Sequence, residues 1–145
     1  MIKIYQMDKN DSSNSSASAT VADAEKLNFQ NKCVDFLNIS DKIRYVGILN
    51  KFGRTIAGKL RKGTRPLLNP EQARDEHFIE SVRQQLRNSF DASIGKTLFS
   101  ITKNEHVTLI VIPSQSREVL YYITTDKEVT LDRVNDIITK VKELE

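Results

Sequence analysis

Few residues of this chain combine the types and the spacing that enzyme chemistry requires. Gly95-Lys96-Thr97 has the last three residues of a phosphate-binding loop, but that motif needs another glycine five positions earlier, between a strand and a helix. Position 90 is Phe, and the tripeptide follows a predicted helix and opens a predicted strand. The order of elements is reversed, which argues against nucleotide binding through this motif.

Side chains that could bind a metal ion or attack a substrate are isolated in the sequence. A zinc site needs several ligands in a tetrahedral arrangement, and the chain offers only Cys33, His77 and His106 as nitrogen or sulfur ligands, without ligand spacing. Cys33 falls in an apolar stripe and is predicted to be a small core residue. His77 is predicted on a helix surface or at an interface, and His106 in a turn. Asp75-Glu76 lies on an amphipathic helix, where charge is normally solvated. We therefore expect no catalytic residue, metal or cofactor, although the residues alone leave general acid–base chemistry open.

The charge of the chain is unevenly distributed. Lys plus Arg number 22 and Asp plus Glu 19, for a formal net charge of +3 over 145 residues. Residues 42–70 hold eight basic residues and no acidic one, which leaves a net charge of −5 for the remainder. A surface of one sign speeds association with anionic partners such as nucleic acid, an acidic protein face, a phosphate-bearing ligand or anionic lipid, although basic loops also serve solubility alone. The predicted partner-binding patch consists of Lys51, Phe52, Arg54, Lys59, Arg61, Lys62 and Arg65.

Composition also predicts the compartment and the domain organisation. A single cysteine excludes an intramolecular disulfide and suits a reducing cytoplasm. No run of about 18 apolar residues exists for a membrane span, and the start of the chain turns polar too soon for a signal peptide. Residues 8–19 contain no large apolar side chain. We therefore predict a disordered Ser/Asn-rich tail over residues 1–19 and a single domain over residues 20–145.

Periodicity predicts eight structural elements after the tail. Asn50–Gly53 suits a tight turn between two strands, and Asn69, Pro70 and Gln72 form a helix-start signature that resembles a capping box. Hairpins and meanders are local connections, so the simplest fold is an α+β fold with a five-stranded antiparallel sheet flanked by helices, in the order α-β-β-α-β-β-β-α. The expected helices span 20–37, 70 to about 94 and about 130–144; the expected strands span 43–49, 55–60, 96–102, 107–112 and 119–125.

This element order and the first hairpin resemble the roadblock/light-chain-seven fold, a relative of the longin and profilin-like domains. Arg44–Gly58 reads Arg-Tyr-Val-Gly-Ile-Leu-Asn-Lys-Phe-Gly-Arg-Thr-Ile-Ala-Gly. Roadblock-type domains carry a similar hairpin, with a small residue in the first strand, a turn that ends in glycine, and an apolar–small pair like Ile56-Ala57. The resemblance covers about Val21–Leu144. Residues 51–54 and 61–63 are also similar to an uncharacterised archaeal protein family.

The resemblance implies a cytoplasmic, non-enzymatic regulatory scaffold. Roadblock-like domains generally dimerise by pairing their second helices and the strand that follows, and many bind or regulate small GTPases. The same residues could instead cover the sheet of one monomer. By this resemblance, the homodimer interface would consist of Phe78, Ile79, Val82, Leu86 and Phe90 on the helix and Leu98, Phe99 and Ile101 on the strand.

Two other functions stay open from the sequence. One is a PAS-like or profilin-like sensor that binds a small anionic ligand at the basic hairpin and linker, near Arg54, Arg61 and Arg65. The other is a nucleic-acid accessory protein, for which Phe52 is the one aromatic residue expected at the tip of the turn. Proteins that bind nucleic acid normally add more exposed aromatics or a recognition helix.

Overall fold

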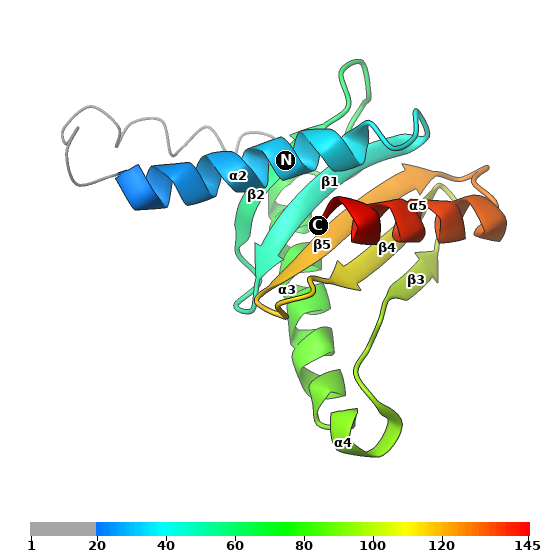
Figure 1. The fold of residues 1–145 in the computed structure, drawn as a ribbon. Coiled ribbons are helices and arrows are strands. Elements are labelled where there is room, and N and C mark those ends of the chain that lie inside the picture. The colour runs from blue at the N-terminus through cyan, green and yellow to red at the C-terminus, as the bar shows by residue number, and fades with distance from the viewer. Residues whose placement is uncertain (1–19) are drawn as a thin grey trace.

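The computed structural model describes residues 20–145, which form five strands and four helices. Their order agrees with the predicted one, with one short helix added after the second long helix (Figure 1). The elements are α2 (Thr20–Leu37), β1 (Ile43–Asn50), β2 (Thr55–Leu60), α3 (Pro70–Asn88), α4 (Asp91–Ile94), β3 (Ser100–Lys103), β4 (Val107–Pro113), β5 (Val119–Asp126) and α5 (Leu131–Leu144). The strands form one antiparallel sheet in the spatial order β2-β1-β5-β4-β3, so the predicted α+β class is confirmed.

The sheet is covered on both faces, by different amounts of helix. Helices α2 and α5 lie on one face, and α3 lies behind the sheet on the other (Figure 1). Alternate residues of each strand point to opposite faces, so the strands supply two separate cores. The larger core, under α2 and α5, includes Phe36, Ile48, Ile110, Ile123 and Val134. The smaller core, on the face of α3, consists of Tyr45, Leu49, Leu109, Val111, Leu120 and Tyr122.

The first hairpin and the start of α3 form as the sequence predicts. The Asn50 side chain accepts hydrogen bonds from the backbone N–H groups of Phe52 and Arg54, at 2.9 and 3.0 Å, and Gly53 has a φ of 82°. Asn69 and Gln72 each bond the other's backbone N–H, which completes a capping box. These two local motifs fix where β2 begins and where α3 starts.

The region after α3 differs from the prediction. The helix ends at Asn88 rather than near Gly95: Ser89 caps it, with its hydroxyl donating to the Leu86 carbonyl at 2.9 Å, and the short helix α4 follows after Phe90. Strand β3 begins at Ser100 rather than at residue 96. Ser100 pairs with Val111, so a longer strand would place residue 98 opposite Pro113, which has no N–H to donate. Leu98 and Phe99 therefore lie in the connection before β3 and not on the strand.

Helix α2 packs on the sheet only by its carboxyl-terminal part. Cys33, Phe36 and Leu37 are buried, whereas Val21 and Leu27 of the predicted apolar stripe are 79% and 56% exposed. The predicted core position of Cys33 is confirmed, and desolvation raises the pKa of its thiol to about 12. None of the helices in the described part of the chain is long and apolar enough to cross a membrane. The predicted tail over residues 1–19 lies outside the described residues.

Candidate functional site on helix α3

Helix α3 is attached to the first hairpin through polar and small groups. The Ser81 hydroxyl donates to the Asn50 carbonyl at 3.2 Å, and the Gln85 amide donates to the Lys51 carbonyl. The turn also packs directly against the helix, because a Cβ atom added at Gly53 would lie 2.7 Å from the Cα atom of Phe78. The backbone of the turn therefore sets the distance and the rotation of the helix.

The rotation of α3 places its polar side inward. Its buried residues are spaced at helical intervals and are mostly polar: Ala73, His77, Glu80, Ser81 and Gln84. The large apolar side chains of the helix point outward, with Phe78 56% and Leu86 67% exposed. The alternative that these residues cover the sheet of one monomer therefore does not hold for Phe78, Ile79 and Leu86. We call five residues the α3 apolar face: Phe78, Ile79, Val82 and Leu86 of the helix, and Phe90, which lies beyond the end of the helix at Asn88 rather than on it as predicted. Of these, only Val82 is half-buried.

More exposed apolar residues follow α3 in the chain. Ile94 of α4, Leu98 and Phe99 of the connection, and Ile101 of β3 are all exposed to solvent. The Arg83 guanidinium donates to the Ser100 hydroxyl at 2.9 Å, which joins the helix to the start of β3. The residues that the sequence predicted as a dimer interface are thus solvent-accessible on the helix and around β3, which is an edge strand of the sheet.

His77 is a packing residue rather than the predicted surface residue. It is fully buried between Tyr45 and Tyr122, with ring centroids 6.0 and 4.6 Å away. Its Nδ1 atom lies 2.6 Å from the Thr55 hydroxyl, and its Nε2 atom has no hydrogen-bond partner among residues 20–145. Desolvation lowers its pKa to about 4, so the ring is neutral at physiological pH. His106 is exposed in the bend between β3 and β4, as predicted.

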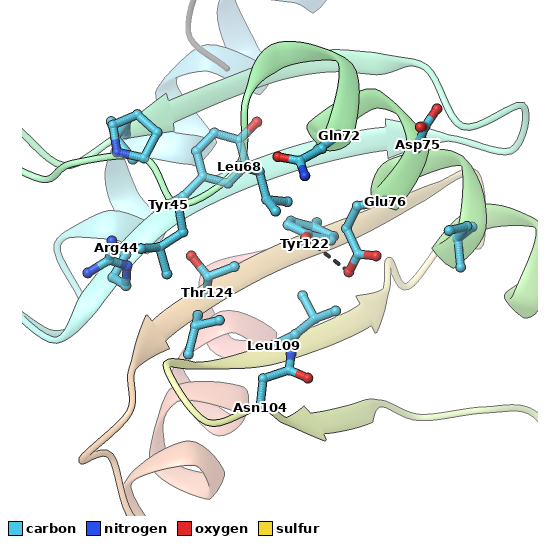
Figure 2. A pocket seen from close by; sticks show the side chains of 15 residues that line it. Arg44, Tyr45, Leu68, Gln72, Asp75, Glu76, Asn104, Leu109, Tyr122 and Thr124 are labelled. Carbon is cyan, nitrogen blue, oxygen red and sulfur yellow. Dashed lines mark hydrogen bonds between the residues drawn. The ribbon is translucent and has the colours of Figure 1, made fainter.

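A cavity of about 340 Å³ opens beside α3, between the helix, the linker before it and the sheet (Figure 2). Its apolar residues include Tyr45, Leu109 and Tyr122 from three neighbouring strands. From the helix, Glu76 points toward Tyr122, whose hydroxyl donates to the carboxylate at 3.3 Å (Figure 2). Burial, together with the charge of Glu76, raises the pKa of the Tyr122 phenol, which stays protonated. We call this space the α3 cavity.

The α3 cavity could not be predicted from the sequence. Tyr45, Leu109 and Tyr122 each look like ordinary strand residues, and they meet only because β5 lies between β1 and β4. Glu76 looked like part of a solvated face, and it is half-buried, whereas its neighbour Asp75 is exposed. The tyrosines Tyr45 and Tyr122 within apolar strands also fit a closed core.

The basic residues of the predicted patch lie in two groups rather than one. Lys51, Phe52 and Arg54 are exposed at the tip of the hairpin, and Arg61, Lys62 and Arg65 follow the other end of β2. A strand of this length separates its ends by about 20 Å. Lys59 is exposed on β2 between the two groups.

The guanidinium of Arg61 is engaged within the fold. It donates to the carbonyls of Leu37 and Ser40 at 2.6 Å and of Ile43 at 2.7 Å. Arg61 therefore holds the connection between α2 and β1, which limits its availability to an anion. Within residues 20–145, no group of three His, Cys, Asp or Glu side chains is arranged to hold a metal ion.

Comparisons with known proteins identify the fold. The model of a family of unknown function, DUF6659, matches residues 22–144. MglB of Myxococcus xanthus superposes with a TM-score of 0.64 at 12% identity, over 83% of this chain and 86% of that one. A roadblock/LC7 domain from Streptomyces avermitilis gives 0.59 at 10% identity, over 79% and 91% of the two chains. A structure described as MglB with tetrameric arrangement gives 0.59 at 12% identity, over 79% and 85%. The search of curated proteins found no match.

At these identities, the likeness concerns the fold alone. It confirms the resemblance to roadblock/light-chain-seven domains that the hairpin and the element order predicted. The similarity to an archaeal family stays a prediction.

Proposed function

Since the chain belongs to DUF6659, a family of unknown function, we propose its function from its fold and its surface: it is a homodimeric regulatory scaffold without enzyme activity that binds a protein partner. The observation that carries the proposal is the α3 apolar face, which the monomer leaves in solvent. Small GTPases are the first partner class to test, because roadblock-like domains often bind or regulate them.

The energetics of α3 support a second copy of the chain as the occupant of this face. Exposed apolar surface costs about 25 cal/mol per Å², and large apolar patches on soluble proteins commonly mark interaction sites. Here the side chains that would normally form a core point outward, and the helix is attached to the hairpin by polar contacts from Ser81 and Gln85. Repacking the monomer could therefore not bury them without breaking those contacts.

The surroundings of α3 also suit a symmetric contact. A twofold axis pairs the same surface patch on both copies, and a helix with a continuous apolar side is self-complementary in this sense. The nearby β3 is an edge strand, whose outer backbone groups can pair with a second strand. A protein of the same fold, MglB, is described with a tetrameric arrangement, which is in line with self-association.

The mass of the protein in solution tests the proposal. We expect a dimer at micromolar concentration by light scattering. Val82→Glu with Leu86→Glu should give a folded monomer, because two charges would enter the interface while Leu86 is 67% exposed in the monomer. Central interface residues commonly contribute about 2 kcal/mol or more to binding, so the dissociation constant of the dimer should rise at least about 30-fold.

The matched control is Leu131→Glu, an equally exposed leucine at the start of α5, on the opposite face of the sheet. This variant should remain dimeric. Circular dichroism of all variants should keep the wild-type spectrum. A wild-type protein that is monomeric at micromolar concentration, or a control that dissociates as well, would contradict the proposal.

A further inference from the structure

We propose that the α3 cavity binds a small organic amine: a protonated amino group on an apolar body, held between Glu76 and the aromatic floor. The cavity shares only Ile79 with the α3 apolar face, and neither a partner protein nor a second copy of the chain is needed to form it. Its walls come from α3, the linker before α3 and three strands of one chain (Figure 2).

The size and lining of the cavity suit an organic ligand. Its volume of about 340 Å³ falls within the range of sites for small molecules, which are mainly apolar with a few polar groups. Tyr45, Leu109 and Tyr122 form an apolar floor, and Leu68 of the linker closes one side (Figure 2). A hydrocarbon chain or a phenyl ring would replace water against these side chains, which is favourable.

The positive charge in the lining is already neutralised. Arg44 lies 3.5 Å from the Asp126 carboxylate, through its Nη1 atom, and donates from Nη2 to the Arg65 carbonyl at 2.7 Å. Its guanidinium therefore has partners on the sheet and the linker. The hypothesis of an anionic ligand relied on three other arginines. None of them lines the cavity: Arg54, Arg61 and Arg65. An anion would find little uncompensated positive charge here.

The negative charge in the lining is not neutralised in this way. Glu76 accepts one hydrogen bond from the neutral Tyr122 phenol, and it takes part in none of the ion pairs of the described residues. Glu80, one turn further on, is buried on the inner side of α3; desolvation raises its pKa, and the charge of Glu76 raises it further. A cation bound at Glu76 would relieve this repulsion.

The aromatic floor favours the same class of ligand. The faces of tyrosine rings attract cations, and such contacts strengthen when water is excluded. Tyr45 and Tyr122 are both buried and lie next to each other, with ring centroids 6.2 Å apart. A carboxylate bonded to the Tyr122 phenol, with the Tyr45 ring in the same lining, is a combination that selects an ammonium group over a carboxylate of the same shape.

Paired ligands of opposite charge test the proposal on the intact protein. Hexylamine and phenethylamine would be titrated against hexanoate and hydrocinnamate, with binding followed by the amide NMR shifts of β1, β4 and β5. We expect the amines to bind at millimolar concentration or better and the carboxylates to bind at least about tenfold more weakly. Equal binding of both classes, or no binding of either amine, would overturn the proposal.

Variants of the charged group make the test specific. Glu76→Gln keeps an acceptor for the Tyr122 hydroxyl and removes the charge, so amine affinity should fall about tenfold or more. Glu71→Gln is the matched control, because Glu71 is exposed in the first turn of α3 and does not line the cavity. Tyr122→Phe keeps Glu76 and frees its carboxylate, so it should bind amines at least as tightly as the wild type.

The amine affinity can be interpreted whether the protein is a monomer or a dimer. Light scattering of the same samples reports the dimer separately, so failure of the scaffold proposal and failure of the amine site are distinguishable. If Glu76→Gln does not fold, Tyr122→Phe and the comparison of amines with carboxylates still decide. An equal loss of affinity in Glu71→Gln and Glu76→Gln would overturn the assignment to Glu76.

Discussion

His77 links the stability of the fold to pH. The ring is fully buried and neutral, with a pKa lowered from 6.5 to about 4 because burial disfavours the charged form. The unfolded chain binds a proton at this residue below about pH 6.5. Stability that depends on His77 is therefore complete above that pH and is lost as the pH falls toward 4.

We expect this loss to reach about 3 kcal/mol by pH 4, from a difference of about two and a half pKa units. Urea unfolding at a series of pH values measures it. His77→Asn, whose side chain can still bond Thr55, should be less stable at neutral pH and should lose stability less steeply between pH 6.5 and 4. A variant whose pH dependence matches that of the wild type would show that other groups cause the acid sensitivity.

Helix α3 and the hairpin turn form one unit because their backbones touch. Gly53 has a φ of 82°, and a Cβ atom there would lie 2.7 Å from the backbone of Phe78. Gly63, in the linker, has nearly the same φ of 83° but nothing within 4 Å of an added Cβ atom. The two glycines therefore separate the cost of the left-handed conformation from the cost of the contact.

Gly63→Ala should cost about 1 kcal/mol of unfolding free energy, which is the conformational penalty alone. Gly53→Ala should cost clearly more, about 2–4 kcal/mol, because the helix must also move away from the turn. Urea unfolding gives both values, and the amide NMR shifts of α3 should change only for Gly53→Ala. Equal costs for the two variants would mean that the turn yields without disturbing the helix.

For the helices and strands, the sequence predicted which elements form, but it did not predict how α3 is oriented. The Asn50–Gly53 turn and the capping box at Asn69 depend on neighbours in sequence, and both were predictable. The rotation of α3 was not, because it depends on the carbonyls of Asn50 and Lys51, which accept hydrogen bonds from the side chains of Ser81 and Gln85. Periodicity shows that a helix has an apolar side, but not whether its own sheet lies there.

At the scale of the whole molecule, the basic residues of the predicted patch stand mainly at the two ends of β2, and we expect the partner to use one of these ends. Lys51, Phe52 and Arg54 stand at the hairpin tip, where Gly53 packs on Phe78 of the α3 apolar face. The Lys51 ammonium lies 5.5 Å from the centre of the Phe52 ring. This end of the hairpin combines exposed charge with exposed apolar surface, as protein-binding sites commonly do.

Lys51→Ala with Arg54→Ala should weaken binding of a purified small GTPase about tenfold and reduce its salt dependence, because two charges that attract an acidic face are lost. Lys62→Ala with Arg65→Ala removes the same charge at the other end of β2 and should change affinity less than about twofold. Calorimetry, with GDP and with a GTP analogue bound to the GTPase, measures both.

The nucleic-acid alternative predicts a different pattern. A short duplex would bind with an affinity that falls steeply with salt, and both double variants would weaken it to a similar extent, since each removes phosphate contacts. Equal effects of the two double variants on GTPase binding would contradict the assignment of the partner site to the hairpin tip.

Helix α3 has its polar side inward and its apolar side outward. This orientation assigns folding and association to different residues, whereas they usually depend on the same ones. In most amphipathic helices, the apolar side chains hold the fold together, so few of them can change during evolution. In this chain, the inner polar side holds α3 in place, and the outer apolar side lies mostly in solvent. Substitutions at Phe78, Ile79 or Leu86 can therefore alter which molecules associate, and how strongly, while folding is left intact, so lineages can diverge in their partners without first acquiring compensating changes in the core.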